Sequence, residues 1–178
     1  MKKKTMYPGK KRIIERTCLI LCSMLLLVVS AGCGKTGGES AGEAASSCTI
    51  TIRCDTILED MDHFNPDKKD FVPEDGVILP ETVMEIKDGD TVYDILRRAC
   101  RDNDILMESR DGMGMTYVEG IAQLYEFDGG ELSGWMYRVN GEFPEYGSDN
   151  LKARDGDNIE WLYTMSLGTD LGDEHNDG

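Results

Sequence analysis

The sequence predicts a single α+β domain in which one helix packs on a sheet. Apolar residues alternate over 48–55, 135–139 and 159–163, which is the period of strands with one buried face. Between these runs, 91–103 carries apolar residues at helical spacing after a capping signal. With 178 residues, part of them in a leader, the chain has room for one domain of ordinary size.

The first predicted strand covers Cys48 to Asp55, where β-branched residues alternate with cysteine and polar side chains. Residues 57–80 mix Asp, Pro, Lys and Gly with isolated apolar residues, so we expect a long surface excursion with one helical turn near 57–61. Long ordered loops in compact domains are often functional. The excursion is therefore a candidate site in its own right.

A short strand over Val83 to Lys87 is expected to lead into the helix. Thr91 and Asp94 have the spacing of a capping box, and the helix is predicted to end near Asn103. Its buried stripe comprises Val92, Ile95, Leu96, Ala99 and Cys100.

The middle of the chain predicts short β-segments separated by turns. Ile105 to Glu108 is one such segment, and 117–121 and 124–127 are two more. Residues 109–116 are expected to form a loop, in which Met113 and Met115 could adapt to a ligand.

The central element is the strand that contains Trp135, Tyr137 and Val139. Asn140-Gly141 follows it, and this dipeptide tolerates the positive φ of a two-residue turn. Pro144 should then end the pairing, because proline has no N–H to give to a ladder. The last strand carries Ile159, Trp161 and Tyr163 on one face.

The first 32 residues have the three parts of a secretion signal, with basic residues, an apolar run over 18–29 and small residues after it. Ser30-Ala31-Gly32-Cys33 resembles the lipobox of bacterial lipoproteins, which makes Cys33 the expected lipidated N-terminus. An ordinary signal peptide with Cys33 left free is the alternative. We expect residues 33–47 to form a flexible linker and residues 166–178 a disordered acidic tail.

Charge excludes two classes of partner. Seven of the 19 Lys and Arg but only one of the 34 Asp and Glu precede Cys33, so the mature chain carries 12 basic against 33 acidic residues. Such an acidic surface repels nucleic acid and anionic lipid headgroups. Membrane attachment would come from the lipid anchor alone, which places the domain outside the cytoplasm on the bacterial cell membrane.

Three cysteines remain in the predicted domain, Cys48, Cys54 and Cys100. Cys48 and Cys54 are too far apart along one strand to bond to each other. Two alternatives remain equally open: a disulfide from Cys100 to either of them, or three buried thiols.

No catalytic or metal-binding pattern stands out. The two histidines, His63 and His175, lie in polar surroundings, and Ser133 is not in a nucleophile elbow. Neither Asp-Gly-Asp turn extends into a calcium loop, and no zinc spacing remains after removal of the signal. We therefore expect no enzyme activity, no catalytic residues, no metal and no cofactor.

The order of elements, with Asp-Gly-Asp-Thr-Val, Gly-Trp-Met-Tyr-Arg-Val-Asn-Gly and Lys-Ala-Arg-Asp-Gly-Asp, resembles the transcobalamin C-terminal-like domain family over about 48–165. The resemblance implies a β-grasp-like fold, with one helix on a small mixed sheet, and the binding of a soluble ligand such as cobalamin or another corrinoid.

Trp135, Tyr137, Asn140 and Tyr146 are the candidate ligand contacts. The alternative is that Trp135 and Tyr137 fill the core beneath the helix. Two function classes therefore stand: a surface lipoprotein that captures a small ligand, and a non-catalytic protein–protein interaction module tethered to the membrane.

Overall fold

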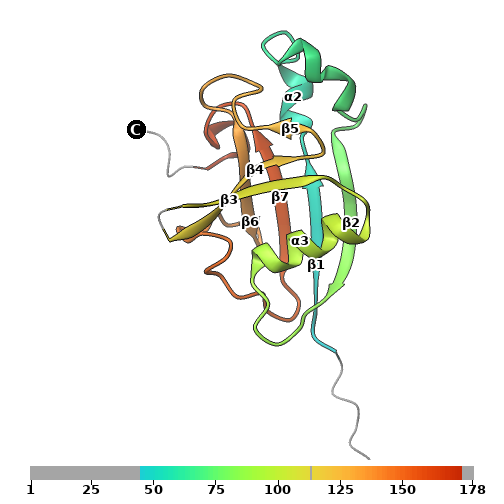
Figure 1. Ribbon diagram of the computed structural model, residues 1–178, viewed down its shortest axis with the longest axis vertical. Helices are drawn as coiled ribbons and strands as arrows, with labels where there is room; N and C mark the ends of the chain where they lie inside the picture. Colours follow the sequence, from blue (N-terminus) through green and yellow to red (C-terminus); the bar gives the residue numbers. More distant parts are fainter. Residues whose placement is uncertain (1–44, 113, 174–178) are drawn as a thin grey trace, which may run out of the picture. The chain divides into compact units, whose positions relative to one another are not determined.

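A four-stranded mixed sheet is the centre of the fold (Figure 1). The structure is a computed structural model that describes residues 45–112 and 114–173. The strand order is β2-β1-β7-β6. The strands are β1 Ser47–Arg53, β2 Val77–Glu85, β6 Gly134–Val139 and β7 Asn158–Thr164. The two central strands, β1 and β7, run parallel, while β2 and β6 pair antiparallel at the two edges.

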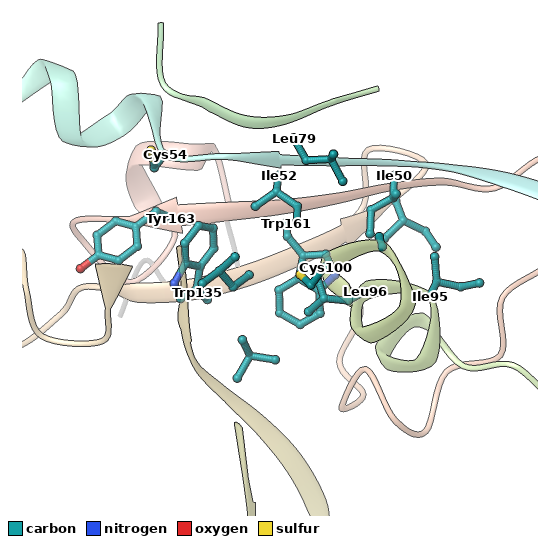
Figure 2. Close-up of a cluster of buried hydrophobic side chains, with 14 of the residues drawn as sticks. Ile50, Ile52, Cys54, Leu79, Ile95, Leu96, Cys100, Trp135, Trp161 and Tyr163 are labelled. Atoms are coloured by element: carbon teal, nitrogen blue, oxygen red, sulfur yellow. The ribbon is translucent and has the colours of Figure 1, made fainter. Parts of the chain in front are cut away.

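Helix α3, Val92–Asp102, packs on one face of this sheet (Figure 1). Thr91 and Asp94 form the predicted capping box, and Asn103 is the C-cap. Figure 2 shows Ile95, Leu96 and Cys100 of α3 facing apolar side chains of the strands. The predicted stripe is buried throughout, and the α+β prediction of one helix on a small mixed sheet is confirmed.

The domain contains a second sheet of three antiparallel strands, in the order β3-β4-β5 (Figure 1). The strands are β3 Met107–Gly112, β4 Met115–Ile121 and β5 Leu124–Tyr125. The prediction of a loop over 109–116 was wrong, because β3 and β4 pair as far as Gly112 and Met115. Gly112 ends β3 as the ladder partner of Met115, and Gly114 lies in the turn between the strands. Met113 lies outside the described residues.

The excursion contains more regular structure than its composition predicts. Helix α2 covers Asp55–Glu59, a 3-10 helix, η1, covers Pro66–Phe71, and β2 begins at Val77 instead of Val83. Leu79 pairs with Ile52, and Pro80 is tolerated because β2 is an edge strand. The prediction of an excursion up to residue 80 was therefore too long.

The segment after β7 is also more ordered than predicted. A short 3-10 helix, η2, covers Thr169–Leu171, and Asp170 accepts a hydrogen bond of 2.7 Å from the N–H of Met165. Thr164 accepts another from Gly168 at 2.7 Å. The predicted disorder is wrong for residues 166–173. Residues 174–178, like the predicted signal peptide, Cys33 and residues 34–44, lie outside the described residues.

Cys48, Cys54 and Cys100 are free, buried thiols. Burial raises the pKa of Cys100 to about 12, and burial with nearby acidic residues raises the pKa of Cys54 to about 12 and that of Cys48 to about 11. The sequence left open a disulfide with Cys100 or three buried thiols, and the structure shows three buried thiols. Within the described residues, no helix has the length and apolar character needed to cross a membrane.

Candidate functional site

Trp135 anchors the core at the start of β6. Its side chain is 6 % exposed, and its ring meets that of Tyr163 edge-on, with centroids 5.4 Å apart. The indole N–H donates to the carbonyl oxygen of Leu124 at 2.9 Å. The expectation that large aromatics on an alternating face fill the core therefore holds for Trp135, although part of this residue also lines a pocket.

Tyr137 lies two residues further along β6 and stacks on Trp161 of β7. The ring centroids are 5.3 Å apart and the planes are inclined by 28°. The hydroxyl donates to the carbonyl oxygen of Tyr146 at 2.6 Å. Burial, together with the charge of Asp149, raises the pKa of Tyr137 to about 12. The hydroxyl is therefore protonated at neutral pH.

Trp161 is the residue of the site that sequence reasoning missed. Only 3 % of it is exposed, and its indole N–H is buried without a hydrogen-bond partner among the described residues. Such an unpaired donor is costly and uncommon in proteins. The signal was available, because Trp161 is the cross-strand partner of Tyr137 when the two alternating strands are aligned.

A pocket of about 490 Å³ lies where these aromatic residues meet the edges of β6 and β4. The segment 143–148 lines it as well. Most of its lining side chains are aromatic or apolar, and its two charged residues are both acidic. The lining residues are Met115, Thr116, Tyr117, Val118, Trp135, Met136, Tyr137, Phe143, Pro144, Glu145, Gly147, Ser148, Trp161 and Asp173.

Two of the four predicted contact residues do not line this pocket. Asn140 uses its side chain to fix the turn: its amide nitrogen donates to Asp157 at 2.9 Å, and its oxygen accepts from the N–H of Asn158 at 2.9 Å. With φ of 56° it also supplies the left-handed conformation of the Asn-Gly turn. Tyr146 contributes its carbonyl oxygen to Tyr137, while its side chain is 68 % exposed.

The polar residues considered for catalysis have structural roles. The Ser133 hydroxyl donates to the carbonyl oxygen of Gly130 and accepts from the N–H of Gly129, both at 2.9 Å. His63 is largely exposed, and its hydrogen bond with Asp60 raises its pKa. His175 lies outside the described residues. Within residues 45–112 and 114–173, no three His, Cys, Asp or Glu side chains converge in a way that would hold a metal ion.

The excursion is fixed to the rest of the domain at its midpoint. Phe64 is 2 % exposed and packs edge-on against Tyr163, with centroids 6.1 Å apart. The next residue, Asn65, donates to Asp128 through its side chain at 2.8 Å. These contacts explain why a segment so rich in Asp, Pro and Lys is ordered.

Residues 89–165 match a family model described as Domain of unknown function (DUF4430), which is less than half of the chain. No curated protein matches. Among solved structures, that of haptocorrin in complex with Cbi is similar to this chain, at 16 % identity and a TM-score of 0.48. That alignment covers 76 % of this chain and 29 % of haptocorrin, so this chain spans less than a third of haptocorrin's length.

A second similar structure is that of a proposed metal-binding protein from Ruminococcus gnavus. It is 15 % identical, with a TM-score of 0.40, and the alignment covers 67 % of this chain and 96 % of the other. Neither likeness identifies a ligand for this chain.

Proposed function

We propose that this protein is an extracytoplasmic lipoprotein that captures a soluble ligand in the pocket between β4 and β6. The observation that carries the proposal is the pocket itself, about 490 Å³ and lined by Trp135, Tyr137 and Trp161. Small-molecule sites have volumes of about 300–1,000 Å³, mostly apolar walls and a few polar groups. Thr116, Glu145 and Ser148 are polar residues among those that line it.

The membrane attachment rests on the sequence alone. A signal peptide over 1–32, lipidation at Cys33 and a linker to residue 47 would hold the domain at the outer face of the bacterial cell membrane. The role that we propose is binding; Ser133 and Asn140, which were considered as site residues, use their side chains to hold turns. A resident cofactor forms no part of the proposal.

A corrinoid such as cobalamin is the first ligand to test. This choice of ligand rests on the resemblance of the Gly134–Gly141 motif to the transcobalamin C-terminal-like domain. The similar haptocorrin structure contains Cbi. A pocket of this size would enclose one side of such a large macrocycle. The macrocycle would stack against aromatic side chains at the rim, of which Phe143 is half-buried.

The test is a titration of the purified full chain with cobalamin and with cobinamide, followed by visible absorbance and by thermal stabilisation. Binding should raise the melting temperature progressively as the free ligand concentration exceeds the dissociation constant. Phe143→Ala removes a ring that lines the pocket, and Phe127→Ala removes an exposed ring outside it, so only the first should weaken binding. No change in either signal up to millimolar ligand would exclude the corrinoid.

The second candidate function, a tethered protein–protein interaction module, is favoured by a different observation. Strand β6 lies at the edge of its sheet, and among the described residues β7 is the one strand that pairs with it. An unpaired strand edge is a template for another chain, and natural proteins usually cover or blunt it.

A further inference from the structure

The outer edge of β6 presents the main-chain groups of every second residue. The N–H of Asn140 donates to Asn158 of the neighbouring segment at 2.8 Å, whereas that of Val139 donates outward to Glu142 at 2.9 Å. Antiparallel strands alternate in this way, so the backbone groups of Trp135 and Tyr137 also face away from β7. Among the described residues, no strand pairs with β6 on this side.

Pro144 leaves this edge open. After the Asn140-Gly141 turn, Glu142 returns along β6 and exchanges two hydrogen bonds with Val139. If the ladder continued, residue 144 would stand opposite Tyr137 and donate to it. Proline has no N–H to donate, and the ladder ends after this one pair.

Across the pocket, residues 115–118 of β4 present a second edge that pairs with no other strand among the described residues, while residues 120 and 121 pair with β5. The N–H of Thr116 does not bond to β3 and instead donates to Asp149 at 2.8 Å, so by the same alternation the backbone groups of Val118 face outward. Strand β4 lies beside β6 without pairing with it. The pocket is therefore bordered on two sides by main-chain donors and acceptors as well as by aromatic rings.

The charges around this edge favour one sign of charge on a binding partner. The two charged residues that line the pocket are Glu145, which is exposed, and Asp173; no Lys or Arg lines it. The sequence after residue 32 carries 33 acidic and 12 basic residues. Complementarity therefore favours a basic partner.

We propose that β6 binds an extended peptide segment that carries Lys or Arg, and that this segment continues the ladder begun by Glu142. The segment pairs with the backbone of Tyr137 and Trp135, its apolar side chains enter the pocket, and its basic side chains lie near Glu145. This is the strand-addition mode of peptide recognition. The inference rests on the second proposed function and names its partner class.

The test uses the full chain and a peptide of about six residues, the usual length of a strand, in which lysine and valine alternate. A matched peptide has every second amide N-methylated, which removes main-chain donors and keeps charge and side chains. We expect the first peptide to bind and the second to bind at least about tenfold more weakly, because two main-chain hydrogen bonds of about 1 kcal/mol each are lost.

Two site-resolved readouts accompany the affinities. Peptide binding should slow amide exchange at Tyr137 and leave Arg138, whose N–H faces β7, unchanged. Glu145→Lys should weaken binding, whereas Glu131→Lys, an exposed acidic residue outside the pocket, should not.

Equal affinity for the two peptides, or unchanged exchange at Tyr137, would overturn the inference. If a corrinoid binds and the peptide neither binds nor competes, the pocket is a small-molecule site: the peptide inference fails and the first proposed function stands. If neither binds, both proposals fail.

Discussion

The guanidinium of Arg98 donates a hydrogen bond of 2.7 Å to a carboxylate oxygen of Asp90, and the two side chains are only 13 % and 12 % exposed. Asp90 also accepts from the N–H of Lys87 at 2.8 Å, and Arg98 also donates to the carbonyl oxygen of Glu85 at 2.6 Å. This pair therefore joins the end of β2, the Asp-Gly-Asp turn and helix α3.

The first prediction concerns the acid limb of the stability profile, that is, the loss of unfolding free energy at low pH. Burial alone would raise the pKa of Asp90, but hydrogen bonds from Arg98 and from the Lys87 backbone outweigh it and lower that pKa. A lowered folded-state pKa adds stability that is complete above the unfolded value of about 3.9 and is lost as pH falls through the folded value. We expect the urea midpoint to fall as the pH drops below about 4.

Asp90→Asn is the control for this prediction. At neutral pH it should lower the free energy of unfolding by on the order of 2 kcal/mol, because Arg98 loses its charged partner. It should also flatten the acid limb. An acid limb as steep as that of the unmutated protein would show that Asp90 is not its source.

The second prediction compares the same substitution at the two tryptophans. Trp135→Phe leaves the carbonyl oxygen of Leu124 without its donor, whereas Trp161→Phe removes an N–H that has no partner. We expect Trp135→Phe to cost about 1–2 kcal/mol more of unfolding free energy than Trp161→Phe. Urea unfolding of both variants measures the difference, and a larger loss in Trp161→Phe would contradict it.

The third prediction concerns the buried thiols. Since Cys48, Cys54 and Cys100 are buried and their pKa values are raised, none should react with an alkylating reagent at neutral pH until the protein is unfolded. Peptide mapping by mass spectrometry, with and without denaturant, distinguishes the two states.

The same thiols should affect stability at alkaline pH. Because their folded-state pKa values are raised, their contribution is complete below the unfolded value of about 8.5 and is lost as pH rises toward 11. The melting temperature should therefore fall in this range. Alkylation of a native thiol, or a melting temperature independent of pH there, would contradict the burial.

The fourth prediction concerns the start of α3. Thr91 accepts from the N–H of Asp94 at 3.2 Å and donates to its carboxylate at 2.7 Å. Thr91→Ala should lower the free energy of unfolding by about 1 kcal/mol. Thr82→Ala, at a half-buried position on edge strand β2 where the hydroxyl donates only to the nearby carbonyl oxygen of Pro80, is the matched control and should have a smaller effect. Equal losses would indicate that the cap contributes little.

Local chemistry in the sequence was enough to predict α3, β1, β6 with its Asn140-Gly141 turn, and β7. A capping box, a positive-φ dipeptide and strict alternation each act within a few residues, so they can be recognised without knowing the fold. Pro80 and the glycines near 112–114 misled the prediction instead. Proline is acceptable on an edge strand and glycine in a hairpin turn, but edge position and pairing partner are properties of the assembled sheet.

The pocket could be predicted only in part. Trp135 and Tyr137 were recognised because they alternate on one strand, but β4, β7 and the segment 143–148 come together only in the folded domain. Asn140 was misplaced for a related reason. Its side-chain amide could hydrogen-bond either a ligand or a turn. The structure shows that it bonds to Asp157 and Asn158, which lie beside the turn only in the folded domain.

The parallel pairing of β1 with β7 joins the first strand of the domain to the last. Chain growth therefore completes α3 and all the other strands before the centre of the sheet can close. A chain that stops before Asn158 would leave β1 with one neighbour and β6 with none, and Trp135 would lose Tyr163, its edge-on aromatic partner. Folding is in this sense governed by the final strand: a chain that ends before β7 keeps only the β1–β2 pair of this sheet for α3 to pack on.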